Sequence, residues 1–247
     1  MKIVVTGGRG LLGTEVVHRL KARGATVTSA SRRTGVDLAT GKGLEAALEC
    51  VDCVVHLAIH PLRHRKVNLD GTRRIIKILA DRPAPPHVVY VSIVGCDCNP
   101  FRYYRAKYAS ELALERSKLP VTVVRATQFH TLVAAVGRAV TTGPVALAPR
   151  GMSFQPCDHH WVAEELADIA LGPAPPSYRR SADRAGPELV SLADAVALIS
   201  AKKGKPPPRM ITLPAIGGTL GAFEAGANLP DADAMIGGPS FREFLGR

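Results

Sequence analysis

The segment Thr6–Gly13, with the sequence TGGRGLLG, constrains the fold of this chain more than any other feature. It follows a short apolar run and opens an amphipathic stretch, so the local order is strand, glycine-rich turn and helix. We expect Gly7 to permit the tight turn, Gly10 to leave room for phosphate groups, and Gly13 to let the helix pack against the strand. Such a turn directs a helix N-terminus at a pyrophosphate. The segment therefore predicts a dinucleotide site, and a glycine-rich loop without a ligand is the alternative.

The rest of the N-terminal half repeats this alternation of strand and helix. Strands are expected at 2–6, 25–29, 52–57, 87–92 and 120–125, and helices at 11–23, 41–49, 66–82 and 103–117. Short connections between such units favour parallel strands joined by right-handed crossovers. The pattern predicts an α/β fold of the Rossmann type, with a doubly wound parallel sheet.

Beyond about residue 126 the sequence becomes richer in clustered Gly and Pro. Helical patterns remain at 162–171 and 192–201, short strands are expected near 144–148, 188–190 and 209–213, and the last 20 residues look loosely structured. A chain of 247 residues suits one α/β domain. We expect a single domain over residues 1–247, with a dinucleotide-binding core over about 1–126 and a smaller, substrate-capping region over about 127–247.

The connection after the second expected strand carries basic side chains where many dinucleotide sites carry an acid. An Asp or Glu about 20 residues beyond the glycine motif usually binds the ribose 2′-hydroxyl of NAD. Here that region reads Ser31-Arg32-Arg33. Two guanidinium groups and a hydroxyl match a 2′-phosphate, whereas the alternative is a solvated basic turn. We therefore expect NADP(H) to be preferred over NAD(H).

Tyr103 and Lys107 are four residues apart in an expected helix and share one of its faces. A nearby ammonium favours the phenolate and lowers the pKa of the tyrosine, so its hydroxyl can exchange protons near neutral pH. Ser92 ends an expected strand, and the carboxyl ends of parallel strands face the cofactor crevice. The alternative is an ordinary helix with a packed tyrosine and a solvated lysine. Tyr104, three residues from Lys107, also remains a candidate for the same place.

Together these motifs resemble the short-chain dehydrogenase/reductase superfamily. The resemblance rests on TGGRGLLG, the strand ending at Val54–Ala58, the segment Asn68–Thr72, the sequence YVS at Tyr90–Ser92, and the pair Tyr103 and Lys107. Over about residues 1–170 the chain is similar to the atypical and extended, NmrA-like branch. The resemblance implies a Rossmann-type fold and a nicotinamide cofactor. It fixes no reaction, because members include reductases, epimerases, dehydratases and cofactor sensors.

The expected catalytic residues are Ser92, Tyr103 and Lys107. Tyr103 would act as general acid, Lys107 would also bond the nicotinamide ribose, and Ser92 would hold a carbonyl oxygen. The expected cofactor-binding residues are Thr6, Gly7, Gly8, Arg9, Gly10, Leu11, Leu12, Gly13, Ser31, Arg32, Arg33, Asp37, Leu38, Leu57, Ala58 and Lys107. We interpret the chain as an NADP-dependent oxidoreductase that reduces a carbonyl or similar group of a small molecule. The alternatives are an NmrA-like sensor without turnover, and a redox-neutral epimerase or dehydratase.

The charge balance is strongly basic, with 32 Lys and Arg against 21 Asp and Glu and a net charge of +11. The basic residues are dispersed, and aromatic residues make up only 5%, so stacking platforms for single strands are scarce. We expect a solvated surface whose field favours an anionic cofactor, and no nucleic-acid partner. The partner is expected to be a small-molecule substrate, and the protein a monomer or homodimer.

The five cysteines predict neither a disulfide framework nor a metal site. Cys50 and Cys53 precede or begin the third expected strand, whereas Cys96 and Cys98 follow the fourth, at the opposite edge of a parallel sheet. A strand of about five residues is roughly 17 Å long, far more than zinc–sulfur bonds can span. Cys96 and Cys98 lie near the expected substrate crevice, where a reactive thiol remains an open alternative.

Several histidines also lie near the expected crevice, at His56, His60 and His64, and again at His159 and His160 beside Asp158. A histidine beside Asp158 could be oriented as a base or bind a metal, but such a pair more often starts a helix with the aspartate as its cap. We therefore leave these histidines out of the catalytic set. The chain has no run of about 18 apolar residues, and its first strand begins at once. We expect no membrane association and a cytoplasmic location.

Overall fold

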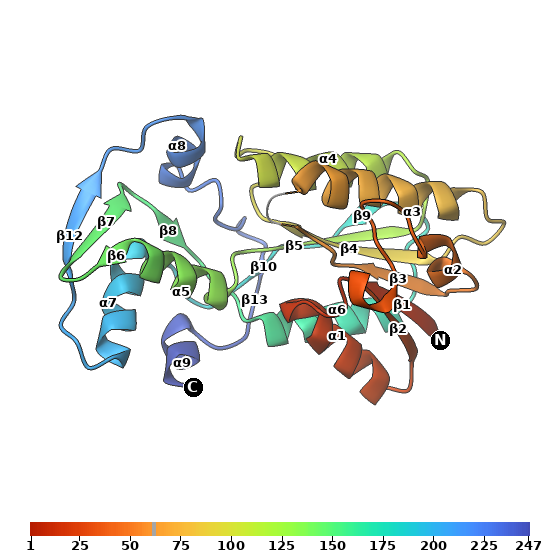
Figure 1. Cartoon of the computed structure of the whole chain (residues 1–247), viewed down its shortest axis with the longest axis horizontal. Helices are drawn as coiled ribbons and strands as arrows, with labels where there is room; N and C mark the ends of the chain where they lie inside the picture. The colour runs from red at the N-terminus through yellow and green to blue at the C-terminus, as the bar shows by residue number, and fades with distance from the viewer. Residues whose placement is uncertain (61–62) are drawn as a thin grey trace. The chain divides into compact units, whose positions relative to one another are not determined.

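The computed structural model describes residues 1–60 and 63–247, which fold as two compact units (Figure 1). The N-terminal unit comprises Met1–Ser92, Arg102–Arg125 and Val162–Ser181. The C-terminal unit comprises Ile93–Phe101, Ala126–Trp161 and Ala182–Arg247. The expected division near residue 126 into a core and a capping region stays a prediction, and the chain returns to the N-terminal unit at residue 162.

A parallel sheet forms the centre of the N-terminal unit. Its strands are β1 (Lys2–Thr6), β2 (Thr26–Ala30), β3 (Cys53–His56), β4 (His87–Ile93) and β5 (Val121–Ala126), in the spatial order β5-β4-β3-β1-β2. The short β9 (Arg179–Arg180) pairs with β5. Strands β3, β4 and β5 are buried along their whole length, as their continuous apolar runs require when both faces of a sheet are covered.

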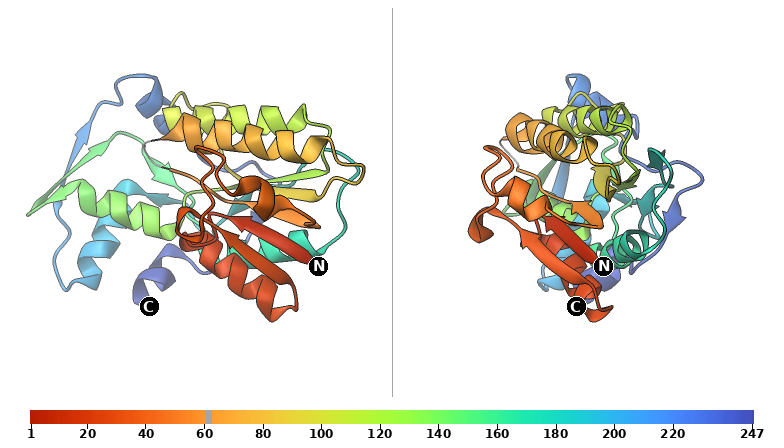
Figure 2. Two further views of the ribbon diagram at one scale, coloured as in Figure 1. Left: turned by 45° about the vertical axis from the view of Figure 1, so that its right-hand side comes forward. Right: turned by 90° about the vertical axis from the view of Figure 1, so that its right-hand side faces the viewer.

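Helices cover both faces of this sheet (Figure 1, Figure 2). One layer contains α1 (Leu11–Ala22) and α6 (His159–Leu171), and the other contains α2 (Leu44–Leu48), α3 (Asp70–Ala80) and α4 (Arg102–Glu115). Arg19 joins α1 to α6 through Glu164, with 2.7 Å between Nε and the carboxylate. The α/β fold with a central parallel sheet and flanking helices is therefore confirmed.

Most expected elements of this unit appear within a few residues of their predicted bounds. Two differ in a way that bears on function. The helix expected at 41–49 shortens to Leu44–Leu48 because glycines with positive φ, Gly41 and Gly43, stand before it. The helix expected at 66–82 becomes α3, preceded by a π-helical segment over His64–Leu69.

The C-terminal unit contains three small groups of strands. β12 (Arg209–Leu213), β7 (Val145–Pro149) and β6 (Thr141–Thr142) form one sheet, β11 (Val190–Ser191) pairs with β8 (Ser153–Phe154), and β10 (Arg184–Ala185) pairs with β13 (Met235–Ile236). Its further helices are α5 (His130–Ala139), α7 (Leu192–Lys202), α8 (Gly218–Glu224) and α9 (Phe241–Gly246). Helix α7 packs against both α5 and α9.

The prediction that the last 20 residues are loosely structured is wrong. Ser240 and Glu243 form a capping box that starts α9, and this helix buries Phe241 fully and Leu245 almost fully. These two apolar side chains are four residues apart, so they share one face of the helix and pack into the core. This packing stabilises the helix although the residues before it are rich in Gly and Asp. Helix α5, absent from the prediction, approaches α7 closely because Gly137 faces Ile199 without a side chain.

Within the described residues, no helix is long and apolar enough to cross a bilayer.

Candidate functional site

One cavity of the N-terminal unit lies where the order of its strands reverses. The chain passes from β1 outward to β2, and β3 then pairs with the other side of β1, so loops diverge at the carboxyl end of β1. Open α/β sheets bind ligands at such a switch point. The cavity holds about 220 Å³ and is lined by Gly7 and Gly10 after β1, Ser31 and Arg32 after β2, and Leu57 after β3. We call it the switch-point cavity.

The glycines of the first turn differ in what makes them necessary. Gly7 has φ of +69°, and a Cβ there would lie 2.9 Å from the backbone of Ala58. A Cβ at Gly13 would overlap the Gly7 carbonyl, so the helix can pack on the turn only without a side chain. Gly10 is different: its φ is −80°, and a Cβ would meet only the Gly7 carbonyl, at 3.3 Å. The protein itself scarcely restricts Gly10, which opens into the cavity, and this fits a cradle for phosphate groups.

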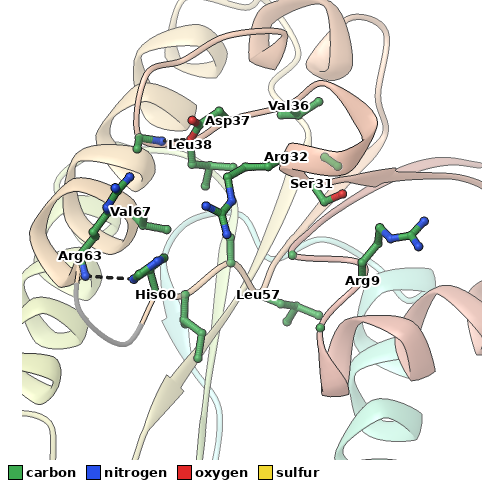
Figure 3. A pocket seen from close by; sticks show the side chains of 16 residues that line it. Arg9, Ser31, Arg32, Val36, Asp37, Leu38, Leu57, His60, Arg63 and Val67 are labelled. Carbon is green, nitrogen blue, oxygen red and sulfur yellow. Dashed lines mark hydrogen bonds between the residues drawn. The ribbon is translucent and has the colours of Figure 1, made fainter.

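Three arginines line the switch-point cavity: Arg9, Arg32 and Arg63. Figure 3 shows the side chain of Arg32 between those of Arg63 and Arg9 in that view. Arg33 does not belong to the described lining, although it follows Arg32 in the same short 3-10 turn. The carboxylate of Asp37 lines the cavity as well, and its Oδ1 accepts a hydrogen bond of 2.8 Å from the Ala39 backbone.

The structure brings together nine of the residues predicted to bind a cofactor. The lining contains Gly7, Arg9, Gly10, Ser31, Arg32, Asp37, Leu38, Leu57 and Ala58. Predicted residues outside the described lining are Thr6, Gly8, Leu11, Leu12, Gly13, Arg33 and Lys107. Their assignment to a cofactor stays a prediction.

Sequence analysis missed several residues of the same cavity. They are Ala30, Val36, Ala39, Ile59, His60, Arg63 and Val67. Those after β3 belong to the connection that leads into the π-helical segment, and the Arg63 backbone N–H donates to His60 Nδ1 at 3.1 Å (Figure 3). The available signal was topological: a connection that follows a strand next to β1 must open at the same edge of the sheet.

Lys107 is held inside the unit against β4. Its side chain is buried, its Nζ donates to the Val91 carbonyl at 2.6 Å, and it lies 4.6 Å from the centre of the Tyr90 ring. A hydrogen bond to a carbonyl and a cation–π contact both offset the cost of burying an ammonium. Because Val91 precedes Ser92, this contact brings the two predicted residues to the same stretch of β4.

The two tyrosines of α4 occupy different environments. Tyr104 is buried, whereas Tyr103 is partly exposed and contacts the ring of His64 edge-on, with 5.7 Å between ring centres. Helix α4 is fixed one turn beyond Lys107, where Arg125 on β5 donates to both carboxylate oxygens of Glu111 at 3.0 and 2.7 Å. Tyr103 therefore offers a hydroxyl on an anchored helix, one turn from Lys107.

His56 is an interior residue that ties the carboxyl ends of two strands to α3. Its Nδ1 lies 2.7 Å from Thr6 Oγ1 and its Nε2 lies 3.0 Å from Thr72 Oγ1, and the Leu57 N–H donates to the Thr6 hydroxyl at 3.2 Å. Burial, with the charge of Lys107 as a smaller cause, lowers the pKa of His56 to about 3. His56 is thus neutral at pH 7. Thr6 was predicted to bind the cofactor, and its hydroxyl belongs to this buried junction.

In the C-terminal unit Asp158 acts as a helix cap, as its sequence position suggested. Its Oδ1 accepts from the backbone N–H groups of His160 and Trp161 at 2.7 and 3.1 Å. Burial raises the pKa values of Cys53 and Cys157 to about 12, so neither of these two thiols is poised to react. The described residues contain no cluster of three or more His, Cys, Asp or Glu that could hold a metal ion.

Comparison with known proteins agrees with this geometry. A model of the NAD-dependent epimerase/dehydratase family matches residues 3–95, which include the glycine turn and strands β1 to β4. This part of the chain is therefore similar to that family. The epimerase family protein SDR39U1 of Bos taurus is 31% identical over 125 residues, which are 45% of this chain and 40% of that protein. The human protein of that name is also 31% identical, over 45% of this chain and 41% of that protein. The match thus spans about two fifths of these relatives.

Solved structures share the fold over nearly the whole chain. A nucleoside-diphosphate-sugar epimerase from Staphylococcus aureus superposes with a TM-score of 0.75 at 17% identity, covering 100% of both chains. An NADPH-dependent quinone oxidoreductase from Escherichia coli, complexed with NADPH, superposes with a TM-score of 0.74 at 17% identity, covering 99% of this chain and 98% of that one. A UDP-glucose 4-epimerase from Thermus thermophilus, complexed with NAD, superposes with a TM-score of 0.68 at 18% identity. The superposition covers 100% of this chain and 98% of that one. The chain therefore shares the fold of these two epimerases and of this oxidoreductase.

Proposed function

We propose that the protein is an NADP(H)-dependent oxidoreductase that reduces a carbonyl or similar group of a small molecule. The observation that carries the proposal is the switch-point cavity, where the unrestricted Gly10 and the side chains of Ser31 and Arg32 meet. Its volume of about 220 Å³ is smaller than the roughly 300–1,000 Å³ typical of ligand pockets, which suits one part of a dinucleotide. The E. coli structure complexed with NADPH shows that this fold accommodates that cofactor.

When bound, the nicotinamide cofactor would supply a hydride. The residues of this chain would hold the cofactor and move the proton. The turn at Gly7 and Gly10 would bind phosphate groups, and Arg32 with Ser31 would bind the 2′-phosphate through charge-assisted hydrogen bonds. Tyr103 would donate its hydroxyl proton to the carbonyl oxygen, while the positive charge of Lys107 stabilises the negative charge left on the phenol oxygen.

The preference for NADP(H) depends on which charged group of the cavity faces the ribose. Arg32 favours a 2′-phosphate, whereas a carboxylate such as Asp37 can accept from a free 2′-hydroxyl. Arg32 is the better candidate because Asp37 already accepts a hydrogen bond from its own turn. The cavity also distinguishes Arg32 from its neighbour Arg33, which lies outside the described lining.

Calorimetric titration of NADPH and NADH tests this choice. Arg32→Gln should weaken NADPH binding by about 10–100-fold, because hydrogen bonds to charged groups contribute about 1.5–3 kcal/mol, and should leave NADH binding nearly unchanged. Arg33→Gln removes the same charge one residue away and serves as the matched control. Equal affinities of the wild type for the two cofactors, or a stronger effect of Asp37→Asn on NADH than of Arg32→Gln on NADPH, would contradict the preference.

A redox-neutral epimerase or dehydratase is the second candidate, favoured by the family model that matches residues 3–95. The two functions differ in their net use of cofactor. A reductase consumes one NADPH for each product, so absorbance at the reduced nicotinamide band falls as product accumulates. An epimerase or dehydratase converts substrate with no net change in that absorbance.

A further inference from the structure

A second concave surface of the N-terminal unit is lined mainly by basic side chains, with a smaller apolar part. The connection after β3 contributes Arg63, His64, Arg65 and Lys66, and α4 contributes Arg102 and Arg105. Leu69 and Ala106 form part of its apolar lining. No acidic residue belongs to the described lining, so five formal positive charges face one groove. We call it the basic groove.

These charges are not neutralised by ion pairs within the part of the chain that the structure describes. Among residues 1–60 and 63–247, no carboxylate forms an ion pair with the five arginines and lysines of the basic groove. By contrast, Arg19 and Arg125 elsewhere in the same unit are paired with glutamates. Like charges gathered in this way repel one another and destabilise the free protein. A bound anion would relieve that repulsion.

The position of two of these arginines at the start of α4 adds to the electrostatic destabilisation of the free protein. Helix α4 begins at Arg102, and its first turn has no acidic residue. The N-terminus of a helix carries a partial positive charge, which favours acidic rather than basic side chains there. Arg102 and Arg105 therefore stand where helix stability alone disfavours them. The same end of the helix dipole favours an anion in the groove.

The opposite wall of the basic groove has an uncommon backbone. Residues 64–69 form a π-helical segment, which carries Arg65 and Lys66 and runs directly into α3. Such segments are rare in proteins and are found frequently at functional sites, because their wide turn is less stable than an α-helix. The unusual backbone and the unneutralised charge are independent features of the same wall.

The basic groove starts beside the proposed proton donor. The ring of His64, which lines the groove, contacts the ring of Tyr103 with 5.7 Å between centres. Arg63 lines both the groove and the switch-point cavity. His64 therefore connects the groove to the ring of Tyr103.

We propose that the basic groove binds the phosphate groups of a small-molecule substrate, so that the reactive carbonyl is presented to Tyr103. The proposal deepens the function proposed above and rests on it for the role of Tyr103. Guanidinium groups suit phosphate because they bind two of its oxygens at once. The specificity of the reaction would then come from charge: a phosphorylated carbonyl compound binds, and its uncharged analogue does not.

Calorimetric titration of inorganic pyrophosphate into the full-length protein, with saturating NADPH present, tests the groove. The double variant Arg102→Gln/Arg105→Gln should weaken pyrophosphate binding by at least about tenfold, because each charge-assisted bond contributes about a factor of ten or more. The matched control is Arg73→Gln/Lys77→Gln, which removes the same charge from exposed positions of α3 outside the groove and should change binding less than twofold. Equal weakening by both double variants would mean diffuse attraction and would overturn the proposal.

The two arginines of α4 do not line the switch-point cavity, so the two proposals fail separately. If NADPH does not bind, the function proposed above fails, while pyrophosphate binding that depends on Arg102 and Arg105 would still establish the groove. If NADPH binds and pyrophosphate does not, the groove fails alone. A DNA duplex that binds more tightly than pyrophosphate at about 150 mM salt would overturn the small-molecule assignment in favour of nucleic acid, provided that the same double variant abolishes the binding.

A last comparison tests the orientation of the ligand. Glyceraldehyde 3-phosphate should bind at least about tenfold more tightly than glyceraldehyde, because only the former has a charged group for the arginines. Tyr103→Phe should weaken the binding of glyceraldehyde 3-phosphate and leave that of pyrophosphate unchanged. If Tyr103→Phe changes neither affinity, the groove serves a ligand unrelated to the reaction, and the substrate assignment is wrong.

Discussion

The two units of this protein differ in how regularly the chain builds them. In the N-terminal unit the five main strands are four to seven residues long and are joined by helices in a repeating order, and β3, β4 and β5 are buried along their whole length. In the C-terminal unit several strands have only two residues, and large apolar side chains such as Leu189 and Ile216 are exposed. A regular unit can place loop residues accurately because each strand end is fixed by its neighbours. The residues predicted to bind a cofactor all lie in that unit.

The sharpest test of this difference is a glycine exchanged in each unit. Gly10→Val should abolish NADPH binding, because a branched side chain would occupy the place proposed for the pyrophosphate, while the fold survives since a Cβ meets only one carbonyl, at 3.3 Å. Gly221→Val on α8 is the matched change in the C-terminal unit, where a Cβ meets nothing within 4 Å. It should leave binding unchanged. Calorimetry measures both, and unaltered NADPH affinity in Gly10→Val would remove the phosphate role of the turn.

The C-terminal unit should depend on its last helix for stability. Phe241→Ala should lower the free energy of unfolding by about 3–5 kcal/mol, the usual cost of removing a buried phenyl group, because Phe241 is fully buried. Phe101→Ala, at a residue that is 44% exposed, is the control and should cost less than about 1 kcal/mol. Denaturant unfolding followed by circular dichroism distinguishes the two. A small effect of Phe241→Ala would show that α9 does not anchor this unit.

The catalytic assignment places all the chemistry on residues of the N-terminal unit. Tyr103→Phe should lower the rate of NADPH-dependent carbonyl reduction by at least about a hundredfold, as expected for loss of a general acid, while NADPH affinity stays the same. Tyr108→Phe, on the same helix, is the matched control and should keep the wild-type rate. A rate that survives in both Tyr103→Phe and Tyr104→Phe would refute the acid role. Steady-state kinetics with the best carbonyl substrate from a screen gives the answer.

Acid should destabilise the N-terminal unit through its buried histidines. Burial lowers the pKa of His56 to about 3 and that of His87 to about 4, whereas in the unfolded chain both lie near 6.5. Protonation therefore favours the unfolded state, and stability that is fully present above pH 6.5 is lost as the pH falls toward 4. The loss is up to about 1.4 kcal/mol per pH unit for each histidine.

Unfolding measured between pH 7 and pH 4 checks this slope. His87→Gln should reduce it, whereas His18→Gln, at an exposed position of α1, should not. An identical slope in the wild type and in His87→Gln would mean that this histidine is not buried in its neutral form.

Much of the N-terminal unit could be predicted from sequence because its signals are local. The glycine turn, the apolar strands and the spacing of Tyr103 and Lys107 depend on residues close together in the chain, and the apolar strands and the helices that follow them appear within a few residues of the expected bounds. The resemblance to a superfamily rested on the same segments. In the C-terminal unit, helices α5 and α9 were missed because their apolar faces have meaning only against α7, whose residues are distant in sequence.

The sequence by itself determined that the chain forms a parallel sheet with a glycine-rich turn after its first strand, since hydrophobic period and glycine placement are properties of neighbouring residues. Only the tertiary structure decided which charges meet. It placed Arg32 and Asp37 in one cavity without Arg33, added Arg63 from a different loop, and brought Arg102 and Arg105 of α4 to the π-helical segment. Electrostatic energy depends on the distance between charges in space. The separation of two residues along the chain does not determine that distance, because the folded strands decide where each loop begins.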